Sequence, residues 1–420
     1  MQTYELNENV FLHIHQETKF KEVKMRLDLT TPFAKGRRAV RTVLSFLLSN
    51  TCKAYPTKDA VQRAADTLYG LELSASDEVR GNAEVLEMAC SCINGSLVNE
   101  PLLEAEYRFL HDFLLEPDLK DGLFNQDVFE ECRKKAATAI RLVDDDPMNH
   151  ACHCADELYG GVVKDKVLPS AEEAEAVTNE EAVREWKTLI HDARIDLYVL
   201  GDATNEECLA LARKHFDFEP RKTNVSLLYP SMVNAYQEKQ EQRSYSQSFL
   251  VQMYHTGLLY TDPLMPAFML GNGILGALPT SMLFQEVREK RSLCYSIGSD
   301  NAVYDGFVRI STQMEAEHLN ETKALIAEQI HRLQNMDYTD EDLETARQMY
   351  INSWRSSLDS ASSLIRDDFN KVMIPGCPDT RTVIEAFRHV SKKDIAQAWK
   401  NLRLQACYTA IGEGNDEEAL

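Results

Sequence analysis

The stretch from Ala39 to Thr57, AVRTVLSFLLSNTCKAYPT, has the spacing of a metal-binding helix but lacks the ligands. On such a helix, two histidines four residues apart bind one zinc ion, while a glutamate between them handles the attacking water. Thr42, Ser45 and Phe46 share one helix face at this spacing, and they offer two hydroxyls and a phenyl ring. None of these side chains is a usual zinc ligand. We therefore expect a helix that keeps the frame of a metal site without its chemistry.

The frame itself follows from an apolar stripe in the same stretch. Five aliphatic residues recur at helical spacing: Val40, Val43, Leu44, Leu47 and Leu48. A second helix is expected from about Thr57, which is suited to cap it, to a stop at Gly70. The apolar stripe predicts that the first helix packs against a core.

Composition and charge restrict the class of partner. The chain has 420 residues, 44% of them hydrophobic, so it can bury large cores in two or more domains. A formal net charge of -22 repels nucleic acid and anionic membrane surfaces, and it favours basic or unfolded polypeptides as partners. No apolar leader or membrane-spanning stretch is recognisable, so we expect a cytoplasmic protein whose ten cysteines are reduced thiols.

One plan of helix and strand occurs twice in the chain. VTNEEAVREWKTL from Val177 and VSKKDIAQAWKNL from Val390 align over thirteen positions without a gap. Each begins with a Thr or Ser suited to cap a helix, and each carries a Trp-Lys pair. A short apolar strand ending in glycine follows each copy: IDLYVLGD up to Asp202 and ACYTAIGEG up to Gly414. Two halves that close with the same order of elements indicate a duplication.

We predict an α+β fold of two homologous domains, each a mostly antiparallel sheet with helices packed on one face. The segment KEVKMRLDL, for example, alternates apolar and charged residues as a half-buried strand does. The predicted domains are residues 1–217 and 248–420. Residues 218–247 are polar, carry two prolines and lack periodicity, which is typical of a linker. The last residues, 414–420, are expected to be disordered.

The segment KAYPT, Lys53 to Thr57, resembles the stretch that follows the zinc helix in the insulinase, pitrilysin and mitochondrial-processing-peptidase family of zinc endopeptidases. Active members carry an inverted H-x-x-E-H motif on that helix. Aligning the segments places the first histidine at Thr42, the glutamate at Ser45 and the second histidine at Phe46. The family's third ligand, a glutamate on a later helix, falls near Thr138 and Ala139, again without a carboxylate. The resemblance spans nearly the whole chain, is to short bacterial members without the zinc motif, and implies the metallohydrolase fold of LuxS and the processing peptidases.

A second motif, SMLFQEVREKRSLCYSIGS, resembles the family's substrate-side signature, in which a helix ends in Arg and a Tyr follows four residues later. The matching positions are Arg291 and Tyr295. The resemblance implies that these side chains hydrogen-bond the substrate backbone and the developing oxyanion. A guanidinium and a phenol are suitable donors toward a carbonyl that becomes charged. Without the resemblance, the same pair is interpreted as a solvated cation at a helix end and the first buried residue of a strand.

The resemblance therefore implies a catalytically inactive homologue with no metal or cofactor of its own, and zinc is expected only in a partner subunit. Some family members work as heterodimers, in which one subunit carries the zinc and the other the Arg and Tyr. We expect this chain to be the second kind, binding peptide and supplying Arg291 and Tyr295 to a zinc-carrying paralogue. Two alternatives stay open: a standalone peptide-binding or scaffold protein, and a metallopeptidase whose metal has moved, for example to His150 and His153.

Other motifs are interpreted as structural. Gly271 to Gly276, GNGILG, matches the dinucleotide-binding fingerprint but lacks a surrounding βαβ unit, so we expect a flexible loop that is structural or lines the substrate. In the cluster His150-Ala-Cys-His-Cys154, only His150 and either His153 or Cys154 share a helix face, which favours an ordinary helix over a metal site.

Cys294 lies between Arg291 and Tyr295 without a paired base in the sequence, and we expect it to be a packing residue. His13 and His15 lie on the polar side of a predicted strand. We expect both imidazoles to be solvated.

Overall fold

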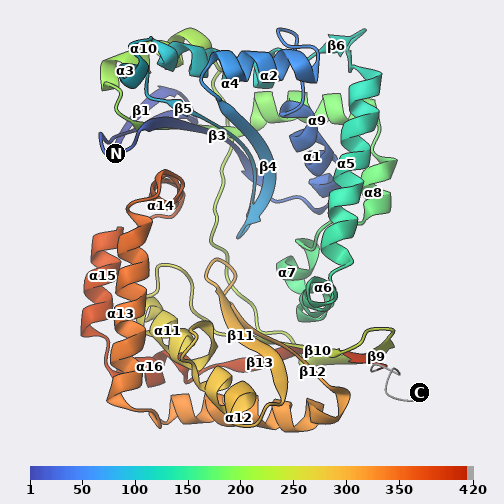
Figure 1. The fold of residues 1–420 in the computed structure, drawn as a ribbon, viewed down its shortest axis with the longest axis vertical. Helices are drawn as coiled ribbons and strands as arrows, with labels where there is room; N and C mark the ends of the chain where they lie inside the picture. The colour runs from blue at the N-terminus through green and yellow to red at the C-terminus, as the bar shows by residue number, and fades with distance from the viewer. Residues whose placement is uncertain (414–420) are drawn as a thin grey trace. The chain divides into compact units, whose positions relative to one another are not determined.

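The computed structural model of the chain describes residues 1–413, which form two compact units, each built around one sheet (Figure 1). The first unit contains residues 1–141, 168–227 and 360–369, and the second contains 142–167, 228–359 and the described residues from 370. Antiparallel pairs predominate in both sheets, and helices pack against them, so the predicted α+β class is confirmed. The domains predicted at 1–217 and 248–420 are each one continuous segment. The two units differ from them, because two short segments are exchanged between the halves of the sequence.

The first unit contains a six-stranded sheet in the order β1-β2-β8-β3-β5-β4. Its strands are β1 (Gln2–Asn7), β2 (Val10–Gln16), β3 (Glu22–Pro32), β4 (Glu72–Arg80), β5 (Ala83–Ile93) and β8 (Arg194–Gly201). Only the pairing of β2 with β8 is parallel. Alternate residues of β3, from Val23 to Leu29, are buried under the helices as predicted. The sheet leaves β4 at one edge.

Helices cover one face of this sheet. They are α1 (Arg38–Leu48), α2 (Lys58–Thr67), α3 (Gly95–Val98), α4 (Leu102–Leu115), α5 (Gln126–Asp144), α8 (Ala171–Ala176), α9 (Asn179–Asp192) and α10 (Asn205–His215), with a 3-10 turn at Lys35–Arg37 and a small hairpin of β6 (Leu119–Lys120) and β7 (Leu123–Phe124). Thr57 caps α2 as predicted, because its hydroxyl accepts a hydrogen bond from the Ala60 N–H at 3.2 Å. The aliphatic stripe of α1 lies in the core at Val43, Leu44 and Leu47.

The second unit contains a five-stranded sheet in the order β11-β12-β10-β13-β9. Its strands are β9 (Gln237–Arg243), β10 (Ser248–His255), β11 (Cys294–Ala302), β12 (Phe307–Met314) and β13 (Arg403–Gly412). Its helices are α6 (Pro147–Tyr159), α7 (Gly161–Asp165), α11 (Met265–Asn272), the π-helical turns η2 (Gly273–Ala277) and η3 (Phe284–Glu289), the 3-10 turn Ala316–His318, α12 (Leu319–Gln334), α13 (Asp340–Ser357), α15 (Thr380–His389) and α16 (Lys392–Trp399). A further helix, α14 (Ala361–Met373), is divided between the two units.

The two copies of the repeat occupy equivalent places in the two sheets. Thr178 caps α9 and Ser391 caps α16, each in a reciprocal capping box. The strand after each helix, β8 or β13, pairs parallel to one neighbour and antiparallel to the other. The predicted repeat of helix and strand is therefore confirmed. Gly414, the end of the second copy, and the segment 414–420 lie outside the described residues.

The predicted linker at 218–247 contains a strand that the sequence did not reveal. Residues 237–243, QEKQEQR, form β9 and pair in parallel with β13. This strand lies at the sheet edge and carries polar side chains on both faces. It therefore lacks the apolar alternation by which a half-buried strand is recognised.

The glycine-rich motif GNGILG forms a helix, so the predicted flexible loop is wrong. Its residues continue α11 into η2, and each of three glycines lies against a neighbour. A Cβ on Gly271 would lie 2.2 Å from Trp399 Nε1, and a Cβ on Gly276 would lie 2.6 Å from Ser299 Oγ. These glycines permit close packing inside a helix, which a sequence pattern does not distinguish from a turn.

His13 is buried, with 1% of its surface exposed, and the prediction of a solvated imidazole there is wrong. Its Nε2 lies 2.9 Å from Asp196 Oδ1, and its ring stacks on Tyr198. On the second face of the first sheet, the charged residues Arg26 and Asp28 of the central strand β3 are buried, whereas alternate residues of the edge strand β4 are exposed. Residues 360–369 belong to this unit: Asp368 pairs with His15 at 2.7 Å, and the Phe369 ring lies beside the Arg26 guanidinium.

The other exchanged segment, residues 142–167, packs on the second sheet. Ala151, Ala155 and Tyr159 of α6 form a core with Val251 of β10 and Tyr408 of β13, on the sheet face opposite the one that α11 and α16 cover. Each unit therefore includes a segment that comes from the other half of the sequence.

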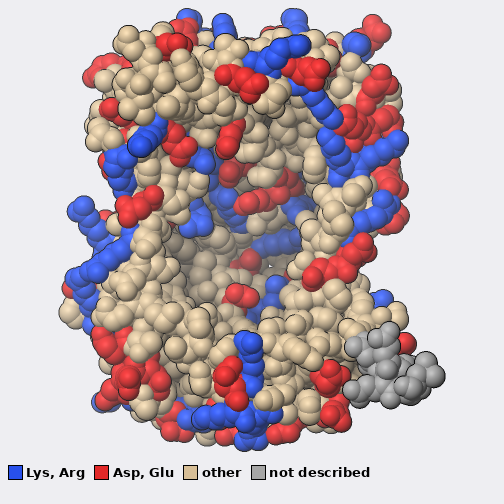
Figure 2. All heavy atoms as spheres, viewed as in Figure 1, with Lys and Arg blue, Asp and Glu red and all other residues tan. Residues whose placement is uncertain are grey.

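The structure shows the state of the cysteines and the distribution of charged side chains. All ten cysteines, which lie within the described part of the chain, are free. No helix among residues 1–413 is long and apolar enough to cross a membrane. On the face seen in Figure 2, Lys and Arg side chains are interspersed with Asp and Glu.

Candidate functional site

The degenerate motif lies on α1, where its polar groups are already engaged. The Thr42 hydroxyl donates to the carbonyl of Arg38 at 3.0 Å, and the Ser45 hydroxyl donates to the carbonyl of Thr42 at 2.8 Å. Both hydroxyls thus bond back to the preceding turn of their own helix. The Phe46 ring packs at the border of the core. These residues do not fit a zinc ion.

The region that corresponds to the third ligand lies on α5, and it also lacks a donor. The exposed Thr138 hydroxyl donates to the Lys134 carbonyl at 2.8 Å, and the next residue is Ala139. Within residues 1–413, no group of three metal-ligating side chains includes a residue of α1. Helix α1 therefore offers no group that could hold a metal for hydrolysis.

A buried ion cluster fixes α1 in the unit instead. Arg41 is fully buried and contacts Glu84 Oε2 of β5 at 3.0 Å and Glu185 Oε1 of α9 at 2.8 Å. One turn earlier, Arg38 pairs with Asp77 of β4 at 2.9 Å. Sequence reasoning missed this cluster, because its three carboxylates come from segments far apart in the chain. No local pattern marks an arginine that faces inward.

The cluster has an excess of negative charge. Two guanidinium groups face three carboxyls, so one carboxyl has no cation of its own. Burial first, and the neighbouring Glu84 carboxylate second, raise the pKa of Asp77 to about 7. Burial also raises the pKa of Glu84. The raised pKa values of Asp77 and Glu84 favour a proton shared between these two carboxyls.

Tyr295 lies at the start of β11, the edge strand of the second sheet, and Arg291 lies just before this strand. Arg291 follows η3 and pairs with Glu321 of α12 at 2.9 Å, with both side chains about half exposed. An exposed pair of this kind is worth little, so the guanidinium is available to another acceptor. Tyr295 is 59% exposed, and the interpretation of this tyrosine as the first buried residue of the strand is wrong.

The backbone explains why Tyr295 projects from the strand. The register of β11 against β12 shifts between Cys294 and Ser296, which leaves Tyr295 at a β-bulge. Ser292, just before the strand, has a left-handed φ of 53° and makes the tight turn after η3. Tyr295 borders a hollow of about 410 Å³. Cys294 is buried, and burial raises its pKa, so its role as a packing residue is confirmed.

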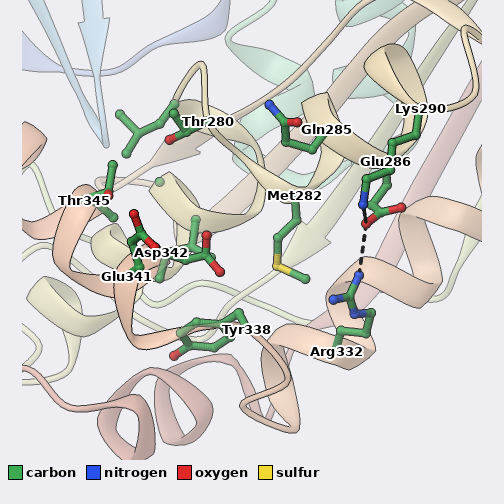
Figure 3. Close-up of a pocket in the computed structure, with 14 residues that line it drawn as sticks. Thr280, Met282, Gln285, Glu286, Lys290, Arg332, Tyr338, Glu341, Asp342 and Thr345 are labelled. Carbon is green, nitrogen blue, oxygen red and sulfur yellow. Dashed lines mark hydrogen bonds and ion pairs between the residues drawn. The ribbon is translucent and has the colours of Figure 1, made fainter.

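A separate cavity of about 400 Å³ borders η3 on the helical side of the second unit (Figure 3). Glu286 and Arg332 line one side of it, 3.5 Å apart, while Glu341 and Asp342 of α13 line the other side. Its charges are mixed. Among the described residues, it contains no group of three side chains placed to hold a metal ion.

The structure thus gathers the residues singled out from the sequence into two separate places. Thr42, Ser45 and Phe46 lie on one helix of the first unit, and Arg291 and Tyr295 lie at one strand end of the second. The substrate role of Arg291 and Tyr295 stays a prediction.

Comparison with known proteins identifies the group of relatives. Residues 176–350 match the family described as "Peptidase M16 inactive domain". The chain is 23% identical over 411 residues, 95% of each protein, to the "Probable inactive metalloprotease YmfF" of Bacillus subtilis (strain 168). The "Uncharacterized zinc protease YmxG" of the same organism is 30% identical over 106 residues, which are 24% of this chain and 26% of that protein.

Solved structures show the same fold. A conserved protein from Enterococcus faecalis V583 matches with a TM-score of 0.93 and 23% identity, covering 99% of each chain. A peptidase M16 inactive domain from Pseudomonas fluorescens matches with a TM-score of 0.78 and 15% identity, covering 97% of each chain. The resemblance that the sequence motifs indicated is confirmed.

Proposed function

We propose that this chain, a homologue of the inactive M16 peptidases, is the non-catalytic subunit of a two-chain zinc endopeptidase. It would bind the peptide and supply Arg291 and Tyr295, while a zinc-carrying paralogue supplies the metal and the general base. One contrast carries the proposal. The ligand positions on α1 hold Thr42, Ser45 and Phe46, whereas the two substrate-side donors are retained and exposed.

The chemistry of these donors suits peptide hydrolysis. When water attacks a peptide carbonyl, its oxygen gains negative charge, and fixed N–H and O–H donors stabilise that charge. Arg291 offers charged N–H groups and gives up only a surface ion pair with Glu321 to do so. Within residues 1–413, the Tyr295 hydroxyl makes no hydrogen bond to another side chain or to the backbone. Both side chains can therefore turn toward a bound carbonyl.

Edge strands offer a place for the peptide. β11 ends one sheet and β4 ends the other, so each leaves one row of backbone N–H and C=O groups without a strand partner in the described sheets. An extended peptide can add to such an edge through main-chain hydrogen bonds. Because Arg291 and Tyr295 lie at the start of β11, a peptide on that edge would pass both donors.

The relatives support a pairing with a zinc-carrying subunit. Bacillus subtilis (strain 168) contains both a relative named as an inactive metalloprotease and one named as a zinc protease. An organism with both types has the parts that a mixed complex needs. We therefore take the partner to be an M16 paralogue with an intact zinc motif, encoded in the same genome.

The test is peptide hydrolysis by the purified chain, by the zinc-carrying paralogue and by their mixture, using internally quenched peptides. We expect hydrolysis only by the mixture. Arg291→Ala should lower kcat about 100-fold, the usual loss for one oxyanion donor, without changing co-elution of the two chains on gel filtration. Tyr295→Phe should also lower kcat.

Arg388→Ala is the matched control. Arg388 is a surface arginine paired with Glu385, and its side chain is 47% exposed, as that of Arg291 is. Its loss should leave kcat unchanged. Equal activity of the Arg291→Ala mixture and the wild-type mixture would contradict the assignment of Arg291 as a donor to the substrate.

The open edges also suit a second candidate, a standalone protein that binds extended peptides without any zinc partner. In that case fluorescent peptides would bind the chain alone, and adding the paralogue would produce no hydrolysis. The same set of measurements therefore distinguishes the two functions.

A further inference from the structure

Three side chains of metal-ligating type meet in the second unit, away from α1. His150 and Cys154 lie one turn apart on α6, and Glu241 lies on β9. Their ligand atoms all lie within 4.8 Å of one another, and no other group of three within residues 1–413 does so. This group differs from the pair His150 and His153 considered from the sequence, because it contains Cys154 and Glu241 and not His153. Glu241 could not be found from the sequence, because it lies in the unrecognised strand.

We propose that His150, Cys154 and Glu241 form a Zn²⁺ site that fastens α6 to the second sheet. An imidazole, a thiolate and a carboxylate are all zinc ligands. The distance from Cys154 Sγ to His150 Nε2 is 3.5 Å. Two such ligands on a tetrahedral zinc ion stand about 3.6 Å apart, given the usual bond lengths. The fourth position would hold water.

The tautomer of His150 that the neighbouring Arg243 favours is also the one that a metal needs. Arg243 Nη2 lies 3.1 Å from His150 Nε2, and a guanidinium can only donate, so Nε2 carries the lone pair. The proton is then on Nδ1, which lies 3.2 Å from Asp144 Oδ1. Metal-bound histidines are oriented in this way by a carboxylate on the far nitrogen.

A second group orients the other ligands. The Tyr408 hydroxyl of β13 donates to Glu241 Oε1 at 2.6 Å. Lys239 Nζ also pairs with Glu241 Oε2 at 2.7 Å, so both oxygens of this carboxylate are held by neighbours. The site therefore has an oriented imidazole and a charged carboxylate before any metal enters.

Two cations compete for the same carboxylate. Arg243 contacts Glu241 at 2.5 Å and Lys239 contacts it at 2.7 Å. Both are partly exposed and can turn toward solvent, and Arg243 now bonds two of the three ligands. We infer that the guanidinium stands where a metal cation would bind, so removing it should strengthen metal binding.

The position gives the metal a structural role. α6 comes from the first half of the sequence, while β9 and β13 come from the second half, and the three elements pack in one unit. A metal bound across α6 and β9 would stabilise the folded unit, because the unfolded chain has no preformed site. This role is independent of peptide hydrolysis and of Arg291.

The experiment is metal binding by the full-length protein without a histidine tag, after treatment with a chelator. Zn²⁺ is titrated against a chromophoric chelator, and Co²⁺ is added separately as a spectroscopic probe. We expect one equivalent of Zn²⁺, a thiolate-to-cobalt charge-transfer band, and a higher thermal midpoint with zinc. Arg243→Ala should bind zinc more tightly than the wild type.

Variants of the ligands and their neighbours sharpen the test. Cys154→Ser should abolish the cobalt band, and Glu241→Gln should weaken zinc binding by more than about 10-fold, whereas Asp144→Asn should weaken it by about 10-fold. Cys152→Ser and His153→Ala are the matched controls on the same helix and should leave binding unchanged, with folding checked by circular dichroism.

Two results would contradict the proposed zinc site. One is zinc binding that survives Cys154→Ser and Glu241→Gln but is lost in His153→Ala. The other is the absence of zinc binding in both the wild-type protein and Arg243→Ala, the variant in which the competing cation is gone and every ligand is kept.

Discussion

Single residues decide what α1 does. The hydroxyls of Thr42 and Ser45 bond to carbonyls of their own helix, so neither is free to ligate a metal. On the neighbouring face, Arg41 makes the helix part of a buried ion cluster. A helix of this kind keeps its place in the fold after the metal chemistry is lost, because its aliphatic and ionic contacts hold it there.

At this scale, the sequence predicted the apolar stripe of α1 and the loss of its ligands. It did not predict that Arg38 and Arg41 are buried or that His13 is covered. A charged side chain is normally solvated, and its burial depends on partners that only the fold brings together. In the same way, Arg26 lies on the polar face of the first sheet but is buried, with the ring of Phe369 beside its guanidinium.

The ion cluster predicts a pH dependence of stability that Asp77→Asn should reduce. The pKa of Asp77 is raised from 3.8 to about 7 in the folded protein. The proton it holds stabilises the fold fully below about pH 4, and this stabilisation is lost as the pH rises to about 7. Between these values, the free energy of unfolding of the wild type should fall relative to that of Asp77→Asn by on the order of 1–4 kcal/mol.

Urea unfolding at several pH values measures this difference. Asp217→Asn changes an exposed carboxyl and should follow the wild-type profile. If Asp77→Asn and the wild type keep a constant difference from pH 4 to 8, the cluster does not hold an extra proton.

Among the elements, the helix of each repeat copy is anchored by a tryptophan at the equivalent position of the repeat. Trp399 of α16 donates to the Phe268 carbonyl at 3.2 Å and stacks on the Phe268 ring, fully buried. In the first unit, the half-buried Trp186 of α9 donates to the Leu114 carbonyl at 2.8 Å. The sequence predicted both helices, because their caps and their apolar spacing are local signals.

Strand β9 and the helical glycines were not predictable in this way. The strand has no apolar face, and the glycines are used for close packing against Trp399 and Ser299. In both cases the deciding contacts are long-range. The Arg-Tyr motif was found only through its resemblance to a family, and the bulge that exposes Tyr295 has no clear signal in the sequence.

The two tryptophans should differ in their contribution to stability. Trp399→Phe leaves the buried Phe268 carbonyl without its donor and leaves a small cavity, so we expect a loss of about 2–4 kcal/mol in the free energy of unfolding. Trp186→Phe should cost less, because Trp186 is only partly buried and its truncation leaves a smaller cavity. The midpoints of urea unfolding compare the two, and a larger loss for Trp186→Phe would contradict this account of the anchors.

For the whole molecule, the exchange of segments has a direct consequence. Residues 142–167 belong to the second unit and residues 360–369 to the first, so each half of the sequence completes the other unit. Boundaries drawn from composition and repeats cannot reveal such an exchange. Nothing in the local sequence of α6 indicates which sheet it packs on.

A chain cut within the connecting segment should therefore stay together. A protease site inserted between Met232 and Val233, which are exposed, would separate residues 1–232 from 233–420 after cleavage. We expect both fragments to co-elute on gel filtration without denaturant, because α6 stays packed on β10 and β13. Fragments that separate under these conditions would show that the exchanged segments contribute little.

We propose that this chain contributes Arg291 to an active site whose zinc belongs to another subunit. The most direct test is the kcat of the mixture of this chain with a zinc-carrying M16 paralogue, measured with wild-type protein and with Arg291→Ala. We predict a fall of about 100-fold with unchanged assembly. Equal kcat values for the two mixtures, in complexes that assemble equally well, would contradict the claim.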